Sequence, residues 1–304
     1  MKVLITGASG QDATHLGKIL EGNGDQVYKI GQIAMDGDSK PELLYFKLTD
    51  EIIREPKRFL NEHKFDVIFH TAAISSPRIC EEDPVKTHEI NVRWVDRILS
   101  AVLGTSTKVI FFGSGSVFGN QSSLQSPFVE SSPLNAKGVY ANSKAQAMEI
   151  VRQYRRQGVW ATSLILFNHE SLNRRGDYLF PVLCRKIADA KFANSKIEIR
   201  NKYDIADWGI AHDYMLAAVN ASMLEYPRDI ILATGQSRSV GELTASLCQG
   251  FDGEDAEIVS IGKERKNSIF VDPSVSFALL GQYNQSNIVD LGINQIKLHL
   301  MGEF

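Results

Sequence analysis

The sequence has few cysteines, no long apolar run and almost no excess charge. Its three cysteines, Cys80, Cys184 and Cys248, lie far apart without CxxC spacing, which suits a reducing cytoplasm and buried structural thiols. No apolar run reaches the ~20 residues that a membrane span needs. A net charge of −3 gives no electrostatic reason to expect a nucleic acid or an anionic membrane as partner. We therefore expect a cytoplasmic protein that binds small molecules.

Length and composition allow one large α/β unit. The chain has 304 residues, of which 43% are apolar and 23% charged, as is ordinary for a soluble globular protein. This length suffices for one α/β domain, or for such a domain with a small additional lobe. Residues 1–5 lead straight into a strand pattern and a glycine turn, so we do not interpret them as a signal peptide.

The first strand pattern, residues 2–6, ends in a glycine-rich turn. Gly7-Ala-Ser-Gly10-Gln-Asp-Ala13 follows it, and Leu16, Ile19 and Leu20 then mark an amphipathic helix. A strand, a glycine turn and a helix in this order predict a dinucleotide site, because glycines let the backbone approach a pyrophosphate at the helix N-terminus. Ala13 takes the third small position of the motif.

The second strand, residues 26–30, should end near the adenosine ribose of the cofactor. An acid there would bind the 2′-hydroxyl of NAD, and an arginine would favour the 2′-phosphate of NADP. The chain offers Gly31, Gln32 and Ile33, with Asp36 and Asp38 a little later. The cofactor is therefore predicted to be NAD or NADP, and the absence of arginine favours NAD.

Further strands alternate with helices over the first ~170 residues, which predicts a Rossmann-type, doubly wound parallel sheet. These strands are expected at residues 44–48, 66–70, 109–112 and 160–167. In such sheets the ligand crevice lies at the carboxyl ends of the strands. The residues that fall at this edge are Gly7, His70, Ser114 and Phe167.

The stretch from Val109 to Lys144 carries the chemistry. Tyr140 and Lys144 are four residues apart at the head of a helix pattern and would share one face. An ammonium beside a phenol favours the phenolate, so the tyrosine pKa should fall toward neutrality and the group could act as a base. Ser114, at a strand end, could share the substrate oxygen with Tyr140. This set would remove a proton from an alcohol while a hydride leaves its carbon.

Two residues near this edge have open roles. His70 could be catalytic, but packing at a strand end is the favoured interpretation. Asn91 lies in a helix predicted over residues 85–103. It could bind the main chain, or it could bridge a water molecule near Lys144.

The pattern is looser after residue 168. Helices are expected at 180–190, from Asp207 to about Leu224, and at 239–248 with Ser239 as N-cap, and a strand is expected at 230–234. Arg174 and Arg175 could grip a phosphate or lie in a solvated loop. We assign residues 1–167 to the dinucleotide-binding domain, with 203–234 returning to it. Residues 168–202 and 235–304 would form a small α/β substrate lobe.

These motifs together resemble the extended short-chain dehydrogenase/reductase family, and GDP-mannose 4,6-dehydratases in particular. The matching segments are Leu4–Asp12 with its Gly-Gln-Asp, the YxxxK pair Tyr140 and Lys144, Leu166–Ser171 followed by Arg174-Arg175-Gly176, Asp207-Trp-Gly with Asp213-Tyr214, and Ala233-Thr-Gly with Ser239-Val240 and Glu242. The resemblance implies a nucleotide-sugar substrate whose C4 hydroxyl is oxidised by bound NAD(P), followed by elimination, epimerisation or reduction.

The resemblance also implies a set of site residues. Ser114, Tyr140 and Lys144 would be catalytic. The cofactor would be bound by Gly7, Ser9, Gly10, Gln11, Asp12, Leu48, Thr71, Ala72, Ala73, Tyr140, Lys144, Phe167, Asn168 and His169. The substrate would be bound by Ser75, Ser116, Asn168, Glu170, Arg174 and Arg175. No metal is expected.

The sequence departs from the family pattern at several positions. The family glutamate that removes the C5 proton and helps expel the C6 hydroxyl is replaced by Ser116, a far poorer base. The catalytic hydroxyl, usually a threonine, is Ser114. Lys47 stands in place of an adenine-contacting aspartate, Ala206 in place of an arginine, and the segment 271–280 is shortened. Hydride chemistry is therefore expected, while elimination and the usual nucleotide contacts are in question.

Two functional hypotheses from different classes follow. The first is a nucleotide-sugar enzyme, either a 4,6-dehydratase or a reductase, epimerase or dehydrogenase that needs only hydride transfer. The second is a cofactor-binding sensor or partner protein without turnover. By resemblance, helices at 85–103 and 140–157 would pair two subunits into a homodimer.

Overall fold

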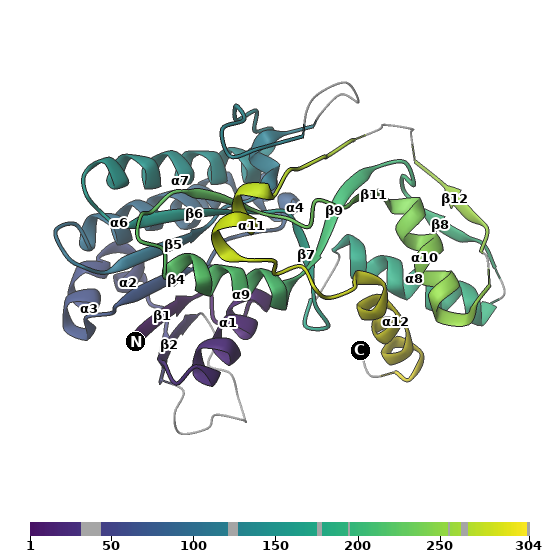
Figure 1. The fold of residues 1–304 in the computed structure, drawn as a ribbon, viewed down its shortest axis with the longest axis horizontal. Helices are drawn as coiled ribbons and strands as arrows, with labels where there is room; N and C mark the ends of the chain where they lie inside the picture. The colour runs from purple at the N-terminus through teal and green to yellow at the C-terminus, as the bar shows by residue number, and fades with distance from the viewer. Residues whose placement is uncertain are drawn as a thin grey trace.

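The fold is built on a seven-stranded parallel sheet with helices on both faces (Figure 1). The structure is a computed structural model that describes residues 1–31, 44–120, 127–174, 178–193, 195–254, 256–262 and 267–302. The strand order is β10-β6-β5-β4-β1-β2-β3, which confirms the predicted doubly wound α/β class. The strands span Lys2–Thr6 (β1), Gln26–Gly31 (β2), Leu44–Lys47 (β3), Val67–His70 (β4), Lys108–Phe112 (β5), Ala161–Leu166 (β6) and Asp229–Leu232 (β10).

Two apolar cores lie on the two faces of this sheet. The central strands are buried along almost their whole length, as expected when both faces of a parallel sheet are covered. One face packs against α1 (Gln11–Gly22) and α9 (Ala211–Ser222). The other face packs against α3 (Pro56–His63), α6 (Trp94–Ala101) and α7 (Gly138–Arg156). Because apolar side chains cover both faces of the sheet, it is a rigid support for the loops at its carboxyl edge.

A smaller lobe has its own core. It contains a three-stranded sheet, in the order β11-β9-β7, and a two-stranded sheet of β12 and β8. Three helices, α8, α10 and α12, pack around a separate group of buried side chains. The bounds are Asn168–Glu170 (β7), Leu179–Ala193 (α8), Ile197–Ile199 (β8), Ile205–Ile210 (β9), Ser237–Ser239 (β11), Val240–Asp252 (α10), Ile258–Ser260 (β12) and Ile288–Leu300 (α12).

The chain passes repeatedly between the two lobes. Within the returning segment 203–234, β9 belongs to the three-stranded sheet, whereas α9 and β10 pack in the dinucleotide domain. Helix α11 (Ser274–Leu280) lies against β10 and α9, although it falls in a range that we assigned to the substrate lobe. In Figure 1 this yellow helix lies over the sheet, while α12 lies in the other lobe.

The predicted helix start at Asp207 is wrong. Residues 205–210 form strand β9, which pairs in parallel with β7 and antiparallel with β11. Helix α9 begins only at Ala211. Gly209 explains part of this, because a Cβ there would lie 2.5 Å from the Tyr214 ring. The tyrosine therefore packs directly on the strand backbone that precedes its helix.

Other helix predictions hold with altered detail. The helix expected over residues 85–103 consists of α5 (Pro84–His88), a π-helical turn at Glu89–Arg93 and α6. Ser239 is the N-cap of α10, in a capping box with Glu242. The remaining short elements are α2 (Asp50–Arg54), α4 (Pro77–Glu82) and the 3₁₀ turn η2 (Gly115–Phe118).

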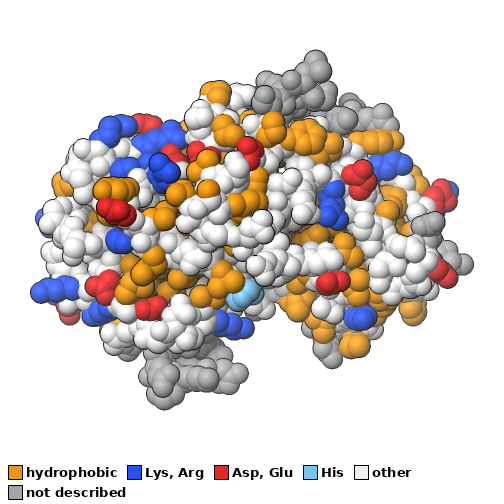
Figure 2. Space-filling view, viewed as in Figure 1, with side chains coloured by type: hydrophobic (Ala, Val, Ile, Leu, Met, Phe, Trp, Pro, Cys, Tyr) orange, Lys and Arg blue, Asp and Glu red, His pale blue; other side chains and the backbone are white. Residues whose placement is uncertain are grey.

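The surface carries both signs of charge. On the face in Figure 2, acidic and basic side chains are interspersed over both lobes. Among the described residues, no helix is long and apolar enough to cross a membrane.

Candidate active site

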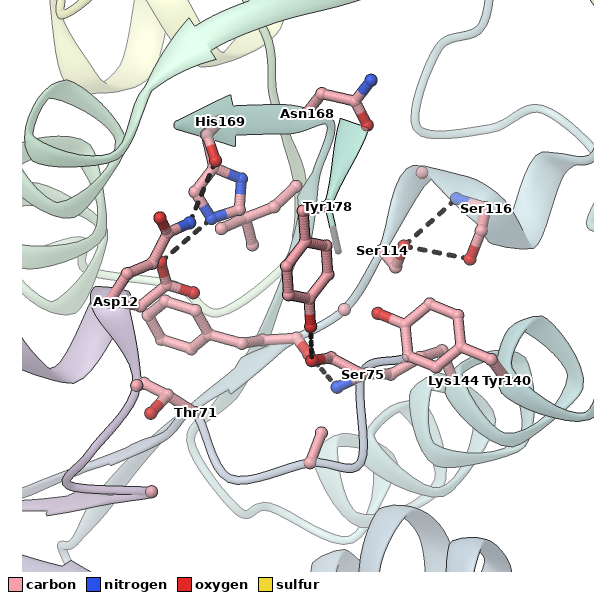
Figure 3. Close-up of a pocket in the computed structure, with 18 of the residues that line it drawn as sticks. Asp12, Thr71, Ser75, Ser114, Ser116, Tyr140, Lys144, Asn168, His169 and Tyr178 are labelled. Carbon is pink, nitrogen blue, oxygen red and sulfur yellow. Dashed lines mark hydrogen bonds and ion pairs between the residues drawn. The ribbon is translucent and has the colours of Figure 1, made fainter. Parts of the chain in front are cut away.

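A cavity of about 610 Å³ lies at the carboxyl edge of the parallel sheet, where the two lobes meet (Figure 3). Of the site residues expected from the sequence, all but Leu48, Glu170 and Arg175 line it. Leu48 packs against the apolar core, Glu170 is buried behind the cavity wall, and Arg175 lies outside the described residues. The topology thus gathers residues from distant parts of the chain, from Gly7 to Ile269.

The glycine turn after β1 allows a close backbone approach. Gly7 has φ +77°, and a Cβ there would lie 2.8 Å from the Ala72 Cα, so a larger residue would push the two loops apart. Gly10 is the N-cap of α1 and offers no side-chain cap. The amides of the first turn of α1 therefore remain available to an anion, as at a diphosphate site.

Two side chains of the Gly-Gln-Asp motif join this turn to β7. The Gln11 amide donates to the His169 carbonyl at 2.9 Å, and its oxygen accepts from the Ser171 hydroxyl at 3.0 Å. Asp12 Oδ1 lies 3.0 Å from His169 Nε2. The cofactor turn and the first strand of the substrate lobe are therefore fixed relative to each other.

His169 lies between two hydrogen-bond acceptors. Its Nδ1 lies 2.7 Å from the Phe167 carbonyl and its Nε2 contacts the Asp12 carboxylate. Both partners only accept hydrogen bonds, so both ring nitrogens must donate. Burial by itself lowers the pKa of His169, but the Asp12 charge outweighs it and raises this pKa. The same pairing offsets burial at Asp12 and holds its pKa below the ordinary value.

Glu170 and Arg174 form a second pair beside the cavity. Burial raises the pKa of Glu170 to about 7 against the lowering effect of Arg174. The Arg174 Nε lies 3.6 Å from Glu170 Oε2, too far for a good hydrogen bond. Arg174 lines the cavity, whereas Glu170 does not, so the arginine is the member of the pair that can meet a ligand.

Tyr140 and Ser114 lie together in the cavity (Figure 3). The predicted fall of the tyrosine pKa is wrong for the side chains of the protein alone. Burial raises the pKa of Tyr140 to about 12, and the hydrogen bond with Ser114 lowers it only in part. A phenolate at this position lacks the solvation that water would give it.

The Lys144 ammonium points to the main chain. Its Nζ donates to the Phe112 carbonyl at 2.7 Å and lies 5.0 Å from the centre of the Phe111 ring. Burial lowers the pKa of Lys144 to about 8. The helix spacing places lysine and tyrosine on one side of α7, as expected, but the ammonium is engaged elsewhere.

Ser116 faces Ser114 rather than a carboxylate. Its hydroxyl donates to Ser114 Oγ at 3.0 Å, and its amide lies 3.3 Å from the same oxygen. Asp12 is the one carboxylate residue among the described cavity-lining residues, and it is paired with His169. Neither Lys47 nor Ala206 lines the cavity.

His70 and Asn91 stand behind the site. His70 is buried, and its Nδ1 lies 3.0 Å from the Thr6 hydroxyl. Its ring stacks on Phe111 and meets Trp94 edge-on. It does not line the cavity, which fits the packing role. Asn91 exchanges hydrogen bonds with the Ile74 backbone and donates to Ser143, as the main-chain alternative proposed.

The nucleotide end of the cofactor site is only partly described. Residues 32–43, the segment after β2 whose lack of arginine favours NAD over NADP, lie outside the described residues. Gln32, Ile33, Asp36 and Asp38 are among them. Among the described residues, no group of three or more histidines, cysteines or acids could hold a metal ion.

Several cavity residues were missed by sequence reasoning. Tyr178 comes just before α8, and its hydroxyl lies 2.7 Å from the Ser75 hydroxyl. A single tyrosine after an arginine-glycine loop carries no signal in the sequence that would mark it as a site residue. Pro77, Asn173 and Ile269 also line the cavity and were not expected.

A family model described as GDP-mannose 4,6 dehydratase matches residues 4–273. The chain belongs to the GDP-mannose 4,6-dehydratase family. This family lies within the NAD-dependent epimerase/dehydratase superfamily of nucleotide-sugar enzymes. The match spans the glycine turn, the Tyr140 and Lys144 pair and β7, and its range includes every residue that lines the cavity.

Known relatives agree with this assignment. GDP-mannose 4,6 dehydratase 2 of Arabidopsis thaliana is 30% identical over 263 residues, covering 79% of this chain and 69% of that protein. GDP-mannose 4,6-dehydratase of Vibrio cholerae is 29% identical over 260 residues, with the same coverage.

Solved structures share the fold. UDP-glucose 4-epimerase from Thermotoga maritima, solved with UDP-glucose, has a TM-score of 0.84 at 17% identity, with both chains fully covered. UDP-glucuronic acid 4-epimerase from Bacillus cereus, solved with UDP-glucuronic acid and NAD, has a TM-score of 0.81 at 18% identity, again over both whole chains. At these identities the likeness establishes the architecture alone.

Proposed function

We propose that the protein oxidises the C4 hydroxyl of a nucleotide sugar by hydride transfer to bound NAD(P), and that the reaction ends without elimination of water. The observation that carries this proposal is one cavity that contains Ser114, Tyr140 and Lys144 at one end and the glycine turn at the other. A 4-epimerase, 4-reductase or 4-dehydrogenase fits this set.

The residues present fit a dinucleotide. Gly7 leaves room for a backbone approach that a Cβ would fill, and the uncapped amides of α1 suit a diphosphate. When bound, a nicotinamide cofactor supplies a hydride acceptor and, in its oxidised form, a positive charge. NAD is favoured over NADP because the sequence offers no arginine just after the second strand, and several of the related structures were solved with NAD.

Tyr140 would remove the proton from the sugar hydroxyl while Ser114 binds the same oxygen. The tyrosine pKa of about 12 is unsuited to a base at neutral pH, so the reaction needs positive charge close to the phenol. Lys144 would supply part of it by releasing the Phe112 carbonyl. Its own pKa of about 8 leaves it mostly protonated at pH 7.

Elimination is not favoured by the described cavity. Removal of a C5 proton and loss of a C6 hydroxyl need a carboxylate or an equally strong base beside the sugar. Ser116 stands where resemblance expects that carboxylate, and its hydroxyl is already bonded to Ser114. Asp12 is held in its pair with His169.

A 4,6-dehydratase is the second candidate, because the family match covers residues 4–273 and the curated relatives bear that name. The two are separated by incubating the protein with NAD(P) and a panel that includes GDP-mannose, and analysing the product by mass spectrometry and NMR. Loss of one water from the sugar, with a 4-keto-6-deoxy signature, would overturn our proposal in favour of the dehydratase.

The variant that tests the role of the catalytic tyrosine is Tyr140→Phe. We expect a loss of turnover of about 10²–10⁴-fold with cofactor binding retained. A wild-type protein that binds NAD(P) but turns over none of the sugars, and whose biological activity survives Tyr140→Phe, would instead be a sensor or partner protein.

A further inference from the structure

Tyr178 links the two lobes across the cavity. It precedes α8 in the substrate lobe, whereas Ser75 lies in the segment after β4 of the dinucleotide domain. Their hydroxyls are 2.7 Å apart, and both residues line the cavity. Figure 3 shows the phenol ring standing upright in the cavity with its hydroxyl at Ser75.

The orientation of this ring is fixed from behind. The Arg174 guanidinium lies 3.8 Å from the ring centre, a cation–π contact that favours a parallel arrangement. On its other side Arg174 lies near the buried Glu170, with its Nε 3.6 Å from Oε2, a separation too long for a good hydrogen bond. The Tyr178 ring therefore contacts Arg174 on its face, and its hydroxyl is hydrogen-bonded to Ser75. These two contacts hold the hydroxyl in one position.

The hydroxyl of Tyr178 faces the catalytic end of the cavity. In Figure 3 this hydroxyl points to Ser75, and the Tyr140 and Ser114 hydroxyls lie to one side of it in the same cavity. The two tyrosines are close enough to interact electrostatically: beside the larger effect of burial, Tyr178 also raises the pKa of Tyr140. A sugar hydroxyl held by Tyr140 and Ser114 would thus have a neighbour near Tyr178 and Ser75.

The hydrogen-bond inventory of this pair defines what it can bind. Two hydroxyls carry two O–H donors, of which one is used between them. One donor and several lone pairs remain, with no net charge. Such a pair suits a neutral hydroxyl, which both donates and accepts, better than a carboxylate or an ammonium group.

We propose that Tyr178 is a specificity-determining residue that binds a free sugar hydroxyl next to the one oxidised by Tyr140 and Ser114. This inference rests on the proposed function and names the part of the substrate that Tyr178 contacts. It assigns Arg174 a positioning role through the tyrosine ring. The substrate class that follows is a neutral, hydroxyl-bearing pyranose attached to a nucleoside diphosphate.

The test compares each nucleotide sugar with its bare nucleotide, in the presence of NAD, by isothermal titration calorimetry. The pairs are GDP-mannose with GDP, UDP-glucose with UDP, and dTDP-glucose with dTDP. For the pair that the wild type binds, Tyr178→Phe should weaken the nucleotide sugar about ten-fold, as for one lost hydrogen bond. Binding of the nucleotide alone should not change.

Two further variants complete the design. Ser75→Ala keeps the phenol hydroxyl but removes its partner, and should weaken the sugar by about three-fold, again without effect on the nucleotide. Tyr226→Phe is the matched control, because Tyr226 is 72% exposed and does not line the cavity. It should bind like the wild type.

Equal shifts for nucleotide and nucleotide sugar would overturn the inference, since they would mark Tyr178 as a contact to the nucleotide or as a structural link between lobes. An unchanged sugar affinity in Tyr178→Phe would overturn it too. If the wild type binds none of the three pairs, the proposed function fails and the inference fails with it.

Discussion

At the scale of single residues, the reaction outcome depends on what stands next to Ser114. Ser116 provides a hydroxyl where elimination chemistry needs a base, and the hydroxyl is committed to its neighbour. Among the described residues, the site therefore has the groups to remove the proton of the C4 hydroxyl. It lacks a free carboxylate that could remove a C5 proton.

Replacing this serine tests that account directly. Ser116→Glu should introduce elimination, seen as a 4-keto-6-deoxy product by NMR, because a carboxylate then faces the sugar. Ser116→Gln has nearly the same shape without the base and should yield none. If Ser116→Glu yields no such product while it still oxidises the sugar, a missing base is not what prevents elimination.

His70 should make the fold sensitive to acid. Burial, and then the nearby Lys144 charge, lower the pKa of His70 to about 3 from an ordinary 6.5. Below pH 6.5 the unfolded chain takes up a proton that the folded chain refuses until about pH 3, so stability falls as the pH drops through this window. The expected slope is about 1.4 kcal/mol for each pH unit.

His70→Phe should remove this part of the pH dependence, measured as the free energy of urea unfolding from pH 7 to pH 4. Phenylalanine preserves an aromatic ring that can stack on Phe111 and meet Trp94 edge-on. Equal slopes in wild type and His70→Phe would show that His70 is protonated in the fold.

At the scale of elements, the strand–turn–helix unit of β1 and α1 depends on contact with the loop after β4. Gly7→Ala places a Cβ 2.8 Å from the Ala72 Cα. Gly24 has a similar φ, +80° against +77°, but has no atom within 4 Å of such a Cβ. The two glycines therefore separate backbone strain from steric clash.

We expect Gly24→Ala to cost about 1–2 kcal/mol of unfolding free energy, for the positive φ alone. Gly7→Ala should cost roughly 1–3 kcal/mol more and should abolish NAD binding in calorimetry. Similar costs for both variants, with NAD binding intact in Gly7→Ala, would contradict a tight approach of the two loops.

The sequence was informative where a local pattern decides the structure. The seven strands of the parallel sheet were expected near their observed positions, because short β-branched and apolar runs bounded by glycine or polar turns usually form strands. The cap at Ser239 was equally readable. Strand β9 was not, because its partners β7 and β11 are distant in the sequence and Asp207 resembles a helix start.

The site was predictable in its membership but not in its electrostatics. Periodicity places Tyr140 and Lys144 on one side of a helix, yet it cannot reveal that the ammonium binds the Phe112 carbonyl. Nor can it reveal the burial that raises the pKa of the phenol. Tyr178 reaches the cavity only because the lobes meet there, and no short-range pattern encodes that meeting.

At the scale of the whole molecule, we expect a homodimer formed by the surface of α5, α6 and α7. Val85, on α5, is 82% exposed, so a charge placed there tests the interface that the resemblance implies without disturbing the core. Val85→Glu should convert the dimer to a monomer in light scattering coupled to size-exclusion chromatography. Val275→Glu, at a 39% exposed position on α11, should remain dimeric.

The repeated passage of the chain between the lobes has a mechanical consequence. Several separate chain connections join the two lobes, in the segments around β7, β9, α9, β11 and α11. Neither lobe corresponds to a continuous stretch of sequence that could be expressed or lost by truncation. Heating should therefore melt both lobes in a single calorimetric transition, and a cut at one connection should leave the halves associated.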